Sequence, residues 1–193
     1  MQAIRHEGIF KSAHEAVVFA CNYASQQYAM SPMAKILQRR AGGSGRGLIG
    51  LDGAAQSGMV LAELQKMDKA QILAMVARST PQRERCDCLH ACCSGWRVSS
   101  MYRDAISELA DIVVPVVGTE EVSNRRLRVA IIAKFFGDKT VVIKEVAHSL
   151  EITLRTAERQ TSVINKYLKE QEKTGWTEFY ARLDEIGMLL EVA

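Results

Sequence analysis

Four of the five cysteines and one of the four histidines of this 193-residue chain lie between Cys86 and Cys93. Thiolate and imidazole groups are the ligands that a tetrahedral structural zinc ion prefers. Gly95 supports the same chemistry, because glycine permits the positive φ that turns backbone amides toward a ligating sulfur. One ion does not bind all five candidates. The cluster therefore predicts zinc bound by four of them: Cys86, Cys88, Cys92 and Cys93, with His90 able to substitute for Cys88 or Cys92.

Two other interpretations of the clustered thiols remain, namely reduced cysteines packed in a helical core and a redox-labile pair. The polar run Arg83-Glu84-Arg85 beside them is not typical of a core. A catalytic zinc is disfavoured, because no nearby glutamate lies in a His-x-x-x-His or His-x-Glu arrangement to act as general base. No Ser/His/Asp, Cys/His or paired-carboxylate arrangement stands out in the sequence. We therefore expect no enzymatic activity.

The stretch 141–168 predicts two helices separated by a short turn. In the first, residues 143–150, apolar side chains recur at helical spacing. A break follows at Glu151-Ile152, and Thr153 is a good N-cap for the second helix because its hydroxyl accepts a bond from a first-turn amide. Ala147 is small enough for two helices that cross steeply. The pattern predicts a helix-turn-helix, whose second helix enters the major groove of DNA.

The second of these helices has one apolar side and one polar side. Ala157, Ile164 and Leu168 share the apolar side, and arginines and hydroxyls predominate on the other. Arginine side chains match the hydrogen-bonding edge of guanine. The alternative is a helical hairpin packed inside a bundle without contact to nucleic acid. The polar side carries Arg155, Glu158, Arg159, Ser162 and Lys166, and Arg155 and Arg159 are predicted to read DNA.

The same stretch resembles region 4 of primary bacterial sigma factors, whose second helix reads a promoter element. The residues that carry the resemblance are Glu145-Val146, Leu150, Ile152-Thr153, Arg155 and Leu168. The resemblance implies that the outward positions of the DNA-reading helix are Leu154, Arg155, Glu158, Arg159 and Ser162. With Thr153 at the start of that helix, these are the predicted DNA-contacting residues.

Composition indicates a folded protein with little excess charge. Hydrophobic residues make up 48% of the chain and charged residues 24%, which excludes a disordered chain. The formal net charge is only +3, so affinity for DNA must come from local clusters of basic residues. Each such cluster could equally be a solvated face. The clusters are Gln38-Arg39-Arg40, Arg83 with Arg85, and Arg125-Arg126 with Arg128.

Helix-forming patterns dominate, and strand-like alternation is scarce. We therefore expect an all-α helical bundle with a C-terminal helix-turn-helix and a short cysteine-rich insertion. A Gly-rich linker at residues 41–50 lacks the Gly-Lys-Ser/Thr ending of a phosphate-binding loop, so we expect no nucleotide to bind there. The expected divisions are a helical segment at 1–40, that linker at 41–50, a helical body at 51–136 with the insertion at 80–98, and the helix-turn-helix with a last helix, Trp176–Leu190, at 137–193.

The N-terminus lacks the uninterrupted apolar core of a signal peptide, and no apolar run approaches the length of a membrane span. Five cysteines without a secretion signal favour a reducing compartment, in which clustered thiols are more often metal ligands than disulfides. We expect a cytoplasmic protein that makes no contact with a membrane.

The cysteine cluster and the helix-turn-helix pattern, taken together, resemble those of the late-gene antitermination proteins of the Q type in lambdoid phages. The resemblance begins at Leu51–Met59, continues through Cys86-x-Cys88 and Cys92–Trp96, and ends in the sigma-like segment. It implies a protein of the host bacterial cytoplasm that binds double-stranded DNA near the phage late promoter. Such proteins engage host RNA polymerase while its sigma factor is still attached, and the polymerase then reads through terminators. None is an enzyme.

Two other classes remain open. One is a dimeric helix-turn-helix repressor or activator without antitermination activity, in which the last helix forms the dimer contact. The other is an enzyme, such as a nuclease or an RNA-processing factor, that uses the Cys/His cluster.

Overall fold

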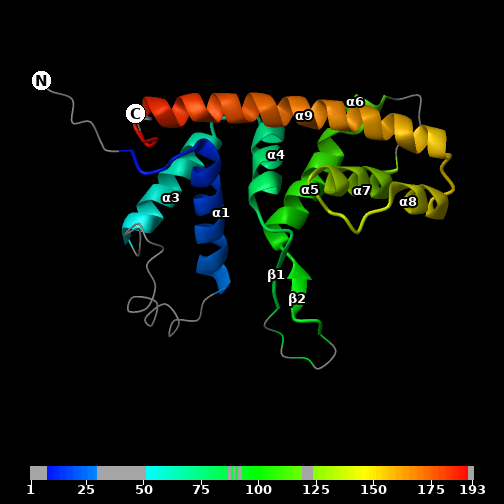
Figure 1. Ribbon diagram of the computed structural model, residues 1–193, viewed down its shortest axis with the longest axis horizontal. Helices are drawn as coiled ribbons and strands as arrows, with labels where there is room; N and C mark the ends of the chain where they lie inside the picture. Colours follow the sequence, from blue (N-terminus) through cyan, green and yellow to red (C-terminus); the bar gives the residue numbers. More distant parts are fainter. Residues whose placement is uncertain are drawn as a thin grey trace, which may run out of the picture. The chain divides into compact units, whose positions relative to one another are not determined.

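The computed structural model describes residues 8–29, 51–86, 88, 90, 93–118 and 124–190. These residues form eight helices and one two-stranded antiparallel sheet (Figure 1). The expectation of a mostly helical protein is therefore confirmed. The elements are α1 (Ala13–Ala29), α3 (Leu51–Leu64), α4 (Lys69–Ser79), β1 (Arg83–Arg85), β2 (Trp96–Val98), α5 (Ser100–Ile112), α6 (Val114–Val117), α7 (Arg125–Phe135), α8 (Ile143–Ser149) and α9 (Leu154–Glu185).

The chain forms two compact units. Unit 1 comprises Met1–Asp68 together with Trp176–Ala193, and unit 2 comprises Lys69–Gly175. These boundaries do not coincide with the divisions expected at 40, 50 and 136. The last part of the helical segment expected at 1–40, from residue 30 onward, and the linker expected at 41–50 lie outside the described residues.

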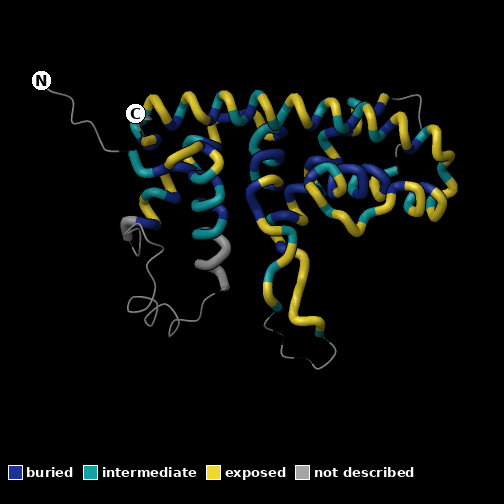
Figure 2. Tube along the Cα trace, viewed as in Figure 1, coloured by how far each residue is buried: buried dark blue, intermediate teal, exposed yellow. Residues whose placement is uncertain are grey.

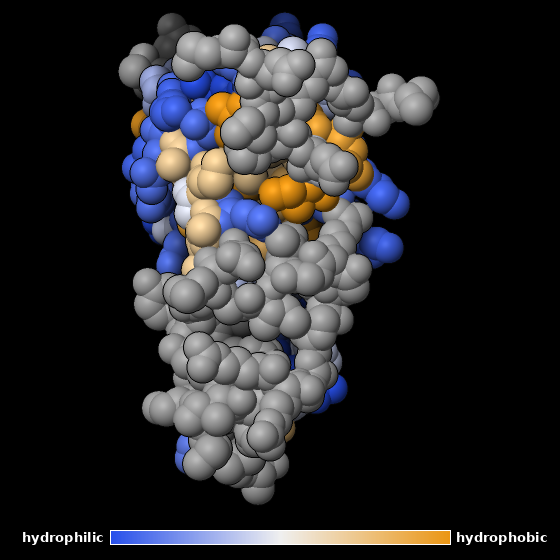
Figure 3. Space-filling view, turned by 90° about the vertical axis from the view of Figure 1, so that its left-hand side faces the viewer, coloured by the Kyte–Doolittle hydropathy of each residue, from blue (hydrophilic) through white to orange (hydrophobic). Residues whose placement is uncertain are grey.

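Unit 1 joins the two ends of the described chain. The amides of Ile9 and Phe10 donate to the carbonyl of Met188, and the amide of Leu190 donates back to Phe10 at 2.9 Å. Only glycine fits at Gly8, since a Cβ there would lie 1.8 Å from the Leu189 carbonyl oxygen. Figure 3 faces this unit and shows hydrophobic surface among hydrophilic residues. The unit is thus closed by backbone pairing between segments that are remote in sequence.

Unit 2 has a continuous hydrophobic core to which α4, α5, α7, α8 and the first half of α9 contribute (Figure 2). Its fully buried side chains include Leu109, Leu127, Ile132, Ile164 and Leu168. Burying a side chain of this size contributes about 1.5–3 kcal/mol. The helices that carry the predicted DNA-contacting residues are therefore anchored in this core.

Arg78, in the last turn of α4, connects three helices of unit 2. Its guanidinium donates to both carboxylate oxygens of Glu172 on α9, from Nε at 2.7 Å and from Nη2 at 3.0 Å. It also lies 5.4 Å from the ring centroid of Phe135 and 5.0 Å from that of Phe136, at the end of α7. This arrangement combines a bidentate ion pair with cation–π contacts.

The predicted boundary before Trp176 is wrong, because α9 runs without a break from Leu154 to Glu185. Gly175 is buried, and a Cβ there would lie 3.1 Å from the Cβ of Gln71 on α4. A glycine inside a helix costs only about 1 kcal/mol relative to alanine, and close packing against α4 offsets that cost. Gly187, with φ of 69°, follows the true end of the helix.

The irregular insertion predicted at 80–98 contains a short β-hairpin. Arg83 pairs with Val98, Glu84 with Arg97 and Arg85 with Trp96. The last helix of the body expected at 51–136 is α7, which begins at Arg125, and the side chain of Asn124 caps it by accepting from the amide of Arg126.

Candidate metal centre and exposed helix face

The β1–β2 hairpin positions the cysteine cluster. Cys86 directly follows β1, and its amide donates to the carbonyl of Gly95 at 2.9 Å, which extends the hairpin ladder by one pair. On the returning side, the amide of Cys93 donates to the carbonyl of His90 at 3.0 Å. Cys86 and Cys93 therefore lie close to where the two strands enter the segment that connects them.

Three thiols come together in this segment. The Sγ atoms of Cys86, Cys88 and Cys93 all lie within 4.8 Å of one another. Such separations suit sulfur ligands of one ion, because each zinc–sulfur bond is about 2.3 Å long. His90 is exposed and is not a member of this group, and Cys92 lies outside the described residues. Three of the four preferred ligands are thus brought together.

The turn after the last thiol has the predicted geometry. Gly95 has φ of 76°, and its amide donates to the Sγ of Cys93 at 3.4 Å. A Cβ at this position would meet no heavy atom within 4 Å, so the glycine is required for its backbone conformation and not for lack of space. This prediction is confirmed.

The local hydrogen bonds shift the thiol pKa values in opposite directions. The backbone amide of His90 lowers the pKa of Cys88, and the thiols of Cys93 and Cys86 lower it further. The Gly95 amide lowers the pKa of Cys93, but the thiols of Cys88 and Cys86 together hold that pKa above its ordinary value. Amides directed at sulfur favour the thiolate, which is the form that binds metal.

The connection between α8 and α9 is a tight turn. The amide of Ile152 donates to the carbonyl of Ala147 at 3.0 Å, and the amide of Glu151 donates to His148 at 3.1 Å. This is the Schellman pattern of a helix C-terminus, whose next residue adopts the left-handed conformation. Glu151 occupies that position with φ of 55°, and it is the non-glycine residue with a positive φ in the described chain. The break predicted at Glu151-Ile152 is confirmed.

Thr153 caps α9 as the sequence indicates. Its Oγ1 accepts a hydrogen bond from the amide of Thr156 at 3.3 Å. Ala157, Ile164 and Leu168 on the inner side of α9 are fully buried, and Ala147 of α8 is 1% exposed. The predicted apolar stripe therefore faces the core of unit 2.

The predicted DNA-contacting residues all lie on the exposed side of this turn and the beginning of α9. Leu154 alone among them is apolar, and it is 43% exposed. Arg155 and Arg159 are four residues apart, which places them on neighbouring turns of one helix face. The structure thus groups Thr153, Leu154, Arg155, Glu158, Arg159 and Ser162 on one accessible surface.

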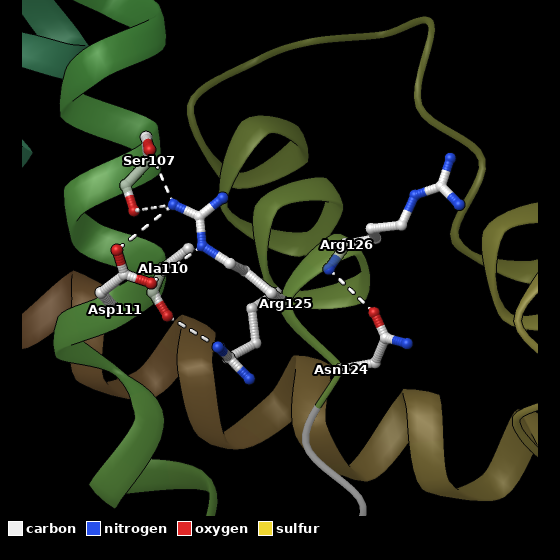
Figure 4. Close-up of polar contacts among 7 residues, drawn as sticks. Ser107, Ala110, Asp111, Asn124, Arg125 and Arg126 are labelled. Carbon is white, nitrogen blue, oxygen red and sulfur yellow. Dashed lines mark hydrogen bonds and ion pairs between the residues drawn. The ribbon is translucent and has the colours of Figure 1, made fainter.

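The basic cluster at Arg125-Arg126 and Arg128 is largely engaged within unit 2 (Figure 4). Arg125 donates to both carboxylate oxygens of Asp111, at 2.9 and 3.2 Å. Arg128 is only 5% exposed, and its Nε donates to the carbonyl of Ala110 at 2.7 Å. That carbonyl belongs to the last turn of α5, where helix carbonyls lack intrahelical partners. Two of the three arginines therefore serve the fold. The cluster at Gln38-Arg39-Arg40 lies outside the described residues.

Sequence reasoning missed Trp96, which is 53% exposed on β2. The signal that points to it is a period of two on each side of the cysteines. Before the cysteines in the sequence, Arg83 and Arg85 are two residues apart. After the cysteines, Trp96 and Val98 are two residues apart. Alternation of this kind is typical of strands with one distinct face.

Comparison of the chain with protein-family models, curated proteins and solved structures finds no match. None of the helices formed by the described residues combines the length and apolar character needed to cross a membrane.

Proposed function

We propose that this protein is a transcription antitermination factor that binds double-stranded DNA through α8 and α9. In this proposal the two helices form a helix-turn-helix, and the beginning of α9 enters the major groove. The observation that supports it best is the exposure of all six predicted contact residues on one face, with Ala157, Ile164 and Leu168 buried behind them.

The proposed contacts are of two kinds: contacts that read the base sequence and contacts that position the protein on the DNA backbone. Arg155 and Arg159 offer guanidinium groups to guanine edges in the groove. Ser162 supplies a hydroxyl for a phosphate oxygen, a contact that fixes the register of the protein on DNA without reading sequence. Thr153 donates its hydroxyl to Oγ1 of Thr156 at 2.9 Å and thereby holds the first turn of α9 at the DNA. Glu158, between the two arginines along the helix, is suited to accept from a cytosine amino group.

We propose further that Cys86, Cys88 and Cys93 bind a structural zinc ion, with Cys92 or His90 as the fourth ligand. The close approach of the three sulfur atoms and the amide that Gly95 directs at Cys93 support this assignment. The ion would join the two ends of the segment that connects β1 to β2. Its role is structural, since metal binding of this kind contributes folding free energy.

The antitermination role rests on the resemblance to the Q-type proteins. It implies double-stranded DNA, host RNA polymerase and sigma factor as partners, in the cytoplasm of the host bacterium. Transcription past a terminator, from a phage late promoter and with purified polymerase, tests the role directly. Addition of the protein should increase read-through. If it changes only the number of transcripts initiated, the protein is a repressor or activator instead.

The DNA interface has its own test with a matched control. Arg155→Ala and Arg159→Ala should each weaken specific DNA binding by about 1–3 kcal/mol. Lys169→Ala removes an exposed cation from the same helix about 15 Å beyond Arg159 and should leave affinity unchanged. Electrophoretic mobility shifts on a late-promoter fragment measure all three. Equal affinities of the arginine variants and the control would refute the assignment.

A further inference from the structure

The β1–β2 hairpin has two faces of different character. Antiparallel partners project to the same side of a ribbon, and successive pairs alternate between sides. The pair Glu84–Arg97 therefore occupies one face, and the pairs Arg83–Val98 and Arg85–Trp96 occupy the other. We call this second face, made of Arg83, Arg85, Trp96 and Val98, the Arg–Trp face.

The two faces differ in the partners of their arginines. On the first face, Arg97 forms an ion pair with Glu84 at 2.8 Å. On the Arg–Trp face, neither Arg83 nor Arg85 lies within ion-pair distance of an acidic group among the described residues. The acid nearest to them in sequence, Glu84, points to the other side. The Arg–Trp face thus carries two positive charges that no described carboxylate offsets.

The apolar residues of the same face remain accessible. Trp96 and Val98 are each 53% exposed, although each is paired with a residue of β1. Backbone hydrogen bonds flank their pairs on both sides: the amide of Ser99 donates to the carbonyl of Gln82, and the amide of Cys86 donates to the carbonyl of Gly95. Pairs between such bonds bring their side chains closer together, so each arginine lies directly beside an apolar partner. Figure 2 shows that the ribbon is mostly exposed.

We infer that the Arg–Trp face binds single-stranded RNA. An exposed indole ring offers a stacking surface to an unpaired base, which a base inside a duplex cannot use. Arg83 and Arg85 lie two residues apart on one extended strand, about 7 Å, and can contact successive phosphates. Charge complementarity and the adjacent ring together favour a polyanion with accessible bases over a protein partner.

The choice of RNA over single-stranded DNA rests on the proposed function. A factor that travels with an elongating polymerase lies near the transcript, which is single-stranded as it emerges. The stacking chemistry itself does not depend on that role. Binding of an unpaired strand by the hairpin and binding of duplex DNA by α9 are therefore separable, and each has its own variants.

Fluorescence of Trp96 tests the inference in the full-length protein. The chain has two tryptophans, and Trp176→Phe leaves Trp96 as the only one. Titration with oligo-uridylate, which forms little structure of its own, should quench this emission as a base stacks on the ring. Trp96→Ala in the native background, measured with labelled RNA by anisotropy, should weaken binding roughly five- to hundredfold.

Arg97 provides the matched control for the charges. Arg85→Gln and Arg97→Gln remove the same charge from neighbouring positions on opposite faces. Arg85→Gln should reduce the slope of log affinity against log salt by about 0.7, as expected for one lost phosphate contact to a single strand. Arg97→Gln should leave affinity and slope close to those of the native protein. Equal losses in both variants, or native affinity in Trp96→Ala, would overturn the inference.

Two further comparisons separate the possible ligands. Oligo-thymidylate of equal length should bind no more tightly than oligo-uridylate, and tighter binding of the DNA strand would refute the assignment to RNA. Arg155→Ala should bind oligo-uridylate as the native protein does. If that variant loses RNA affinity, the α9 face and not the hairpin holds the RNA. Failure of read-through with intact RNA binding would reject only the antitermination role.

Discussion

Replacement of Glu151 by glycine should stabilise the protein. Glu151 lies at the turn between α8 and α9 with φ of 55°, in the left-handed region that residues with a Cβ rarely adopt. Gly137 after α7 and Gly187 after α9 occupy equivalent positions, with φ of 97° and 69°. Each ends a helix through the same pair of hydrogen bonds. Of these three helix ends, only the turn before the proposed DNA-reading helix has a residue with a Cβ in the left-handed conformation, and its backbone is therefore strained.

The expected magnitude follows from two opposing terms. The left-handed conformation costs a residue with a Cβ about 1–2 kcal/mol, which Glu151→Gly removes. The same substitution lowers stability by about 0.4–1 kcal/mol, because glycine gives the unfolded chain more conformational freedom. The free energy of unfolding should therefore rise by about 0.5–1 kcal/mol. For a chain of this length, each kcal/mol raises Tm by about 2–4 °C.

Two controls separate the backbone effect from the loss of a carboxylate. Glu151→Gln removes the charge but keeps the strained conformation, so its stability should match that of the native protein. Gly137→Ala introduces the corresponding strain after α7 and should lower stability by about 1 kcal/mol. Urea titrations followed by circular dichroism at 222 nm give the comparison. If Glu151→Gly is no more stable than Glu151→Gln, the turn is not strained.

Four further predictions concern side chains of unit 2. Arg78→Ala should lower the free energy of unfolding by about 1–3 kcal/mol. Arg78→Lys should recover only part of this loss, because lysine lacks the planar guanidinium that donates to both oxygens of Glu172. If urea titrations show the native stability in Arg78→Lys, or the same loss in both variants, the role assigned to the guanidinium is refuted. Arg128→Met should cost about 1–3 kcal/mol by leaving a buried carbonyl without its donor, and a neutral result would contradict the buried hydrogen bond. Burial, then the charge of Asp138, raises the pKa of Tyr102 to about 12, so the stability it confers is complete below about pH 10 and is lost as pH rises toward 12; Tyr102→Phe should lack this component in pH-dependent denaturation. Elemental analysis of protein purified without added metal should find about one zinc per chain, and Cys93→Ser should release it, whereas a folded, metal-free native protein would refute the zinc site.

Local physical chemistry explains the features that were predicted correctly. The Thr153 cap and the φ of Gly95 depend on a few neighbouring residues, whose hydrogen-bonding and conformational preferences are visible in the sequence. The apolar stripe of α9 was predictable for the same reason, because helical periodicity alone fixes which side chains share a face. The nearness of Cys86, Cys88 and Cys93 follows in part from their short separation along the chain.

Features that depend on distant partners were not predictable in this way. A new helix was predicted to begin at Trp176, directly after Gly175, since nothing in that neighbourhood reveals that α4 packs closely against Gly175. The β-hairpin was missed because each strand has only three residues, too few for alternation to be distinctive. The pairing of Phe10 with Leu189 joins segments at opposite ends of the chain, and no local pattern specifies it.

The arginines illustrate why charge clusters in a sequence do not identify a nucleic-acid surface. Arg125 and Arg128 are adjacent to Arg126 in sequence, yet they bind a carboxylate and a helix carbonyl of α5. Arg78 is likewise held by Glu172. An arginine engaged in this way cannot turn to a phosphate without leaving a protein group unsatisfied, which costs about 1–3 kcal/mol when that group is buried. The nucleic-acid surfaces proposed for this protein therefore follow from the exposure of their residues on one face and not from the density of basic residues in the sequence.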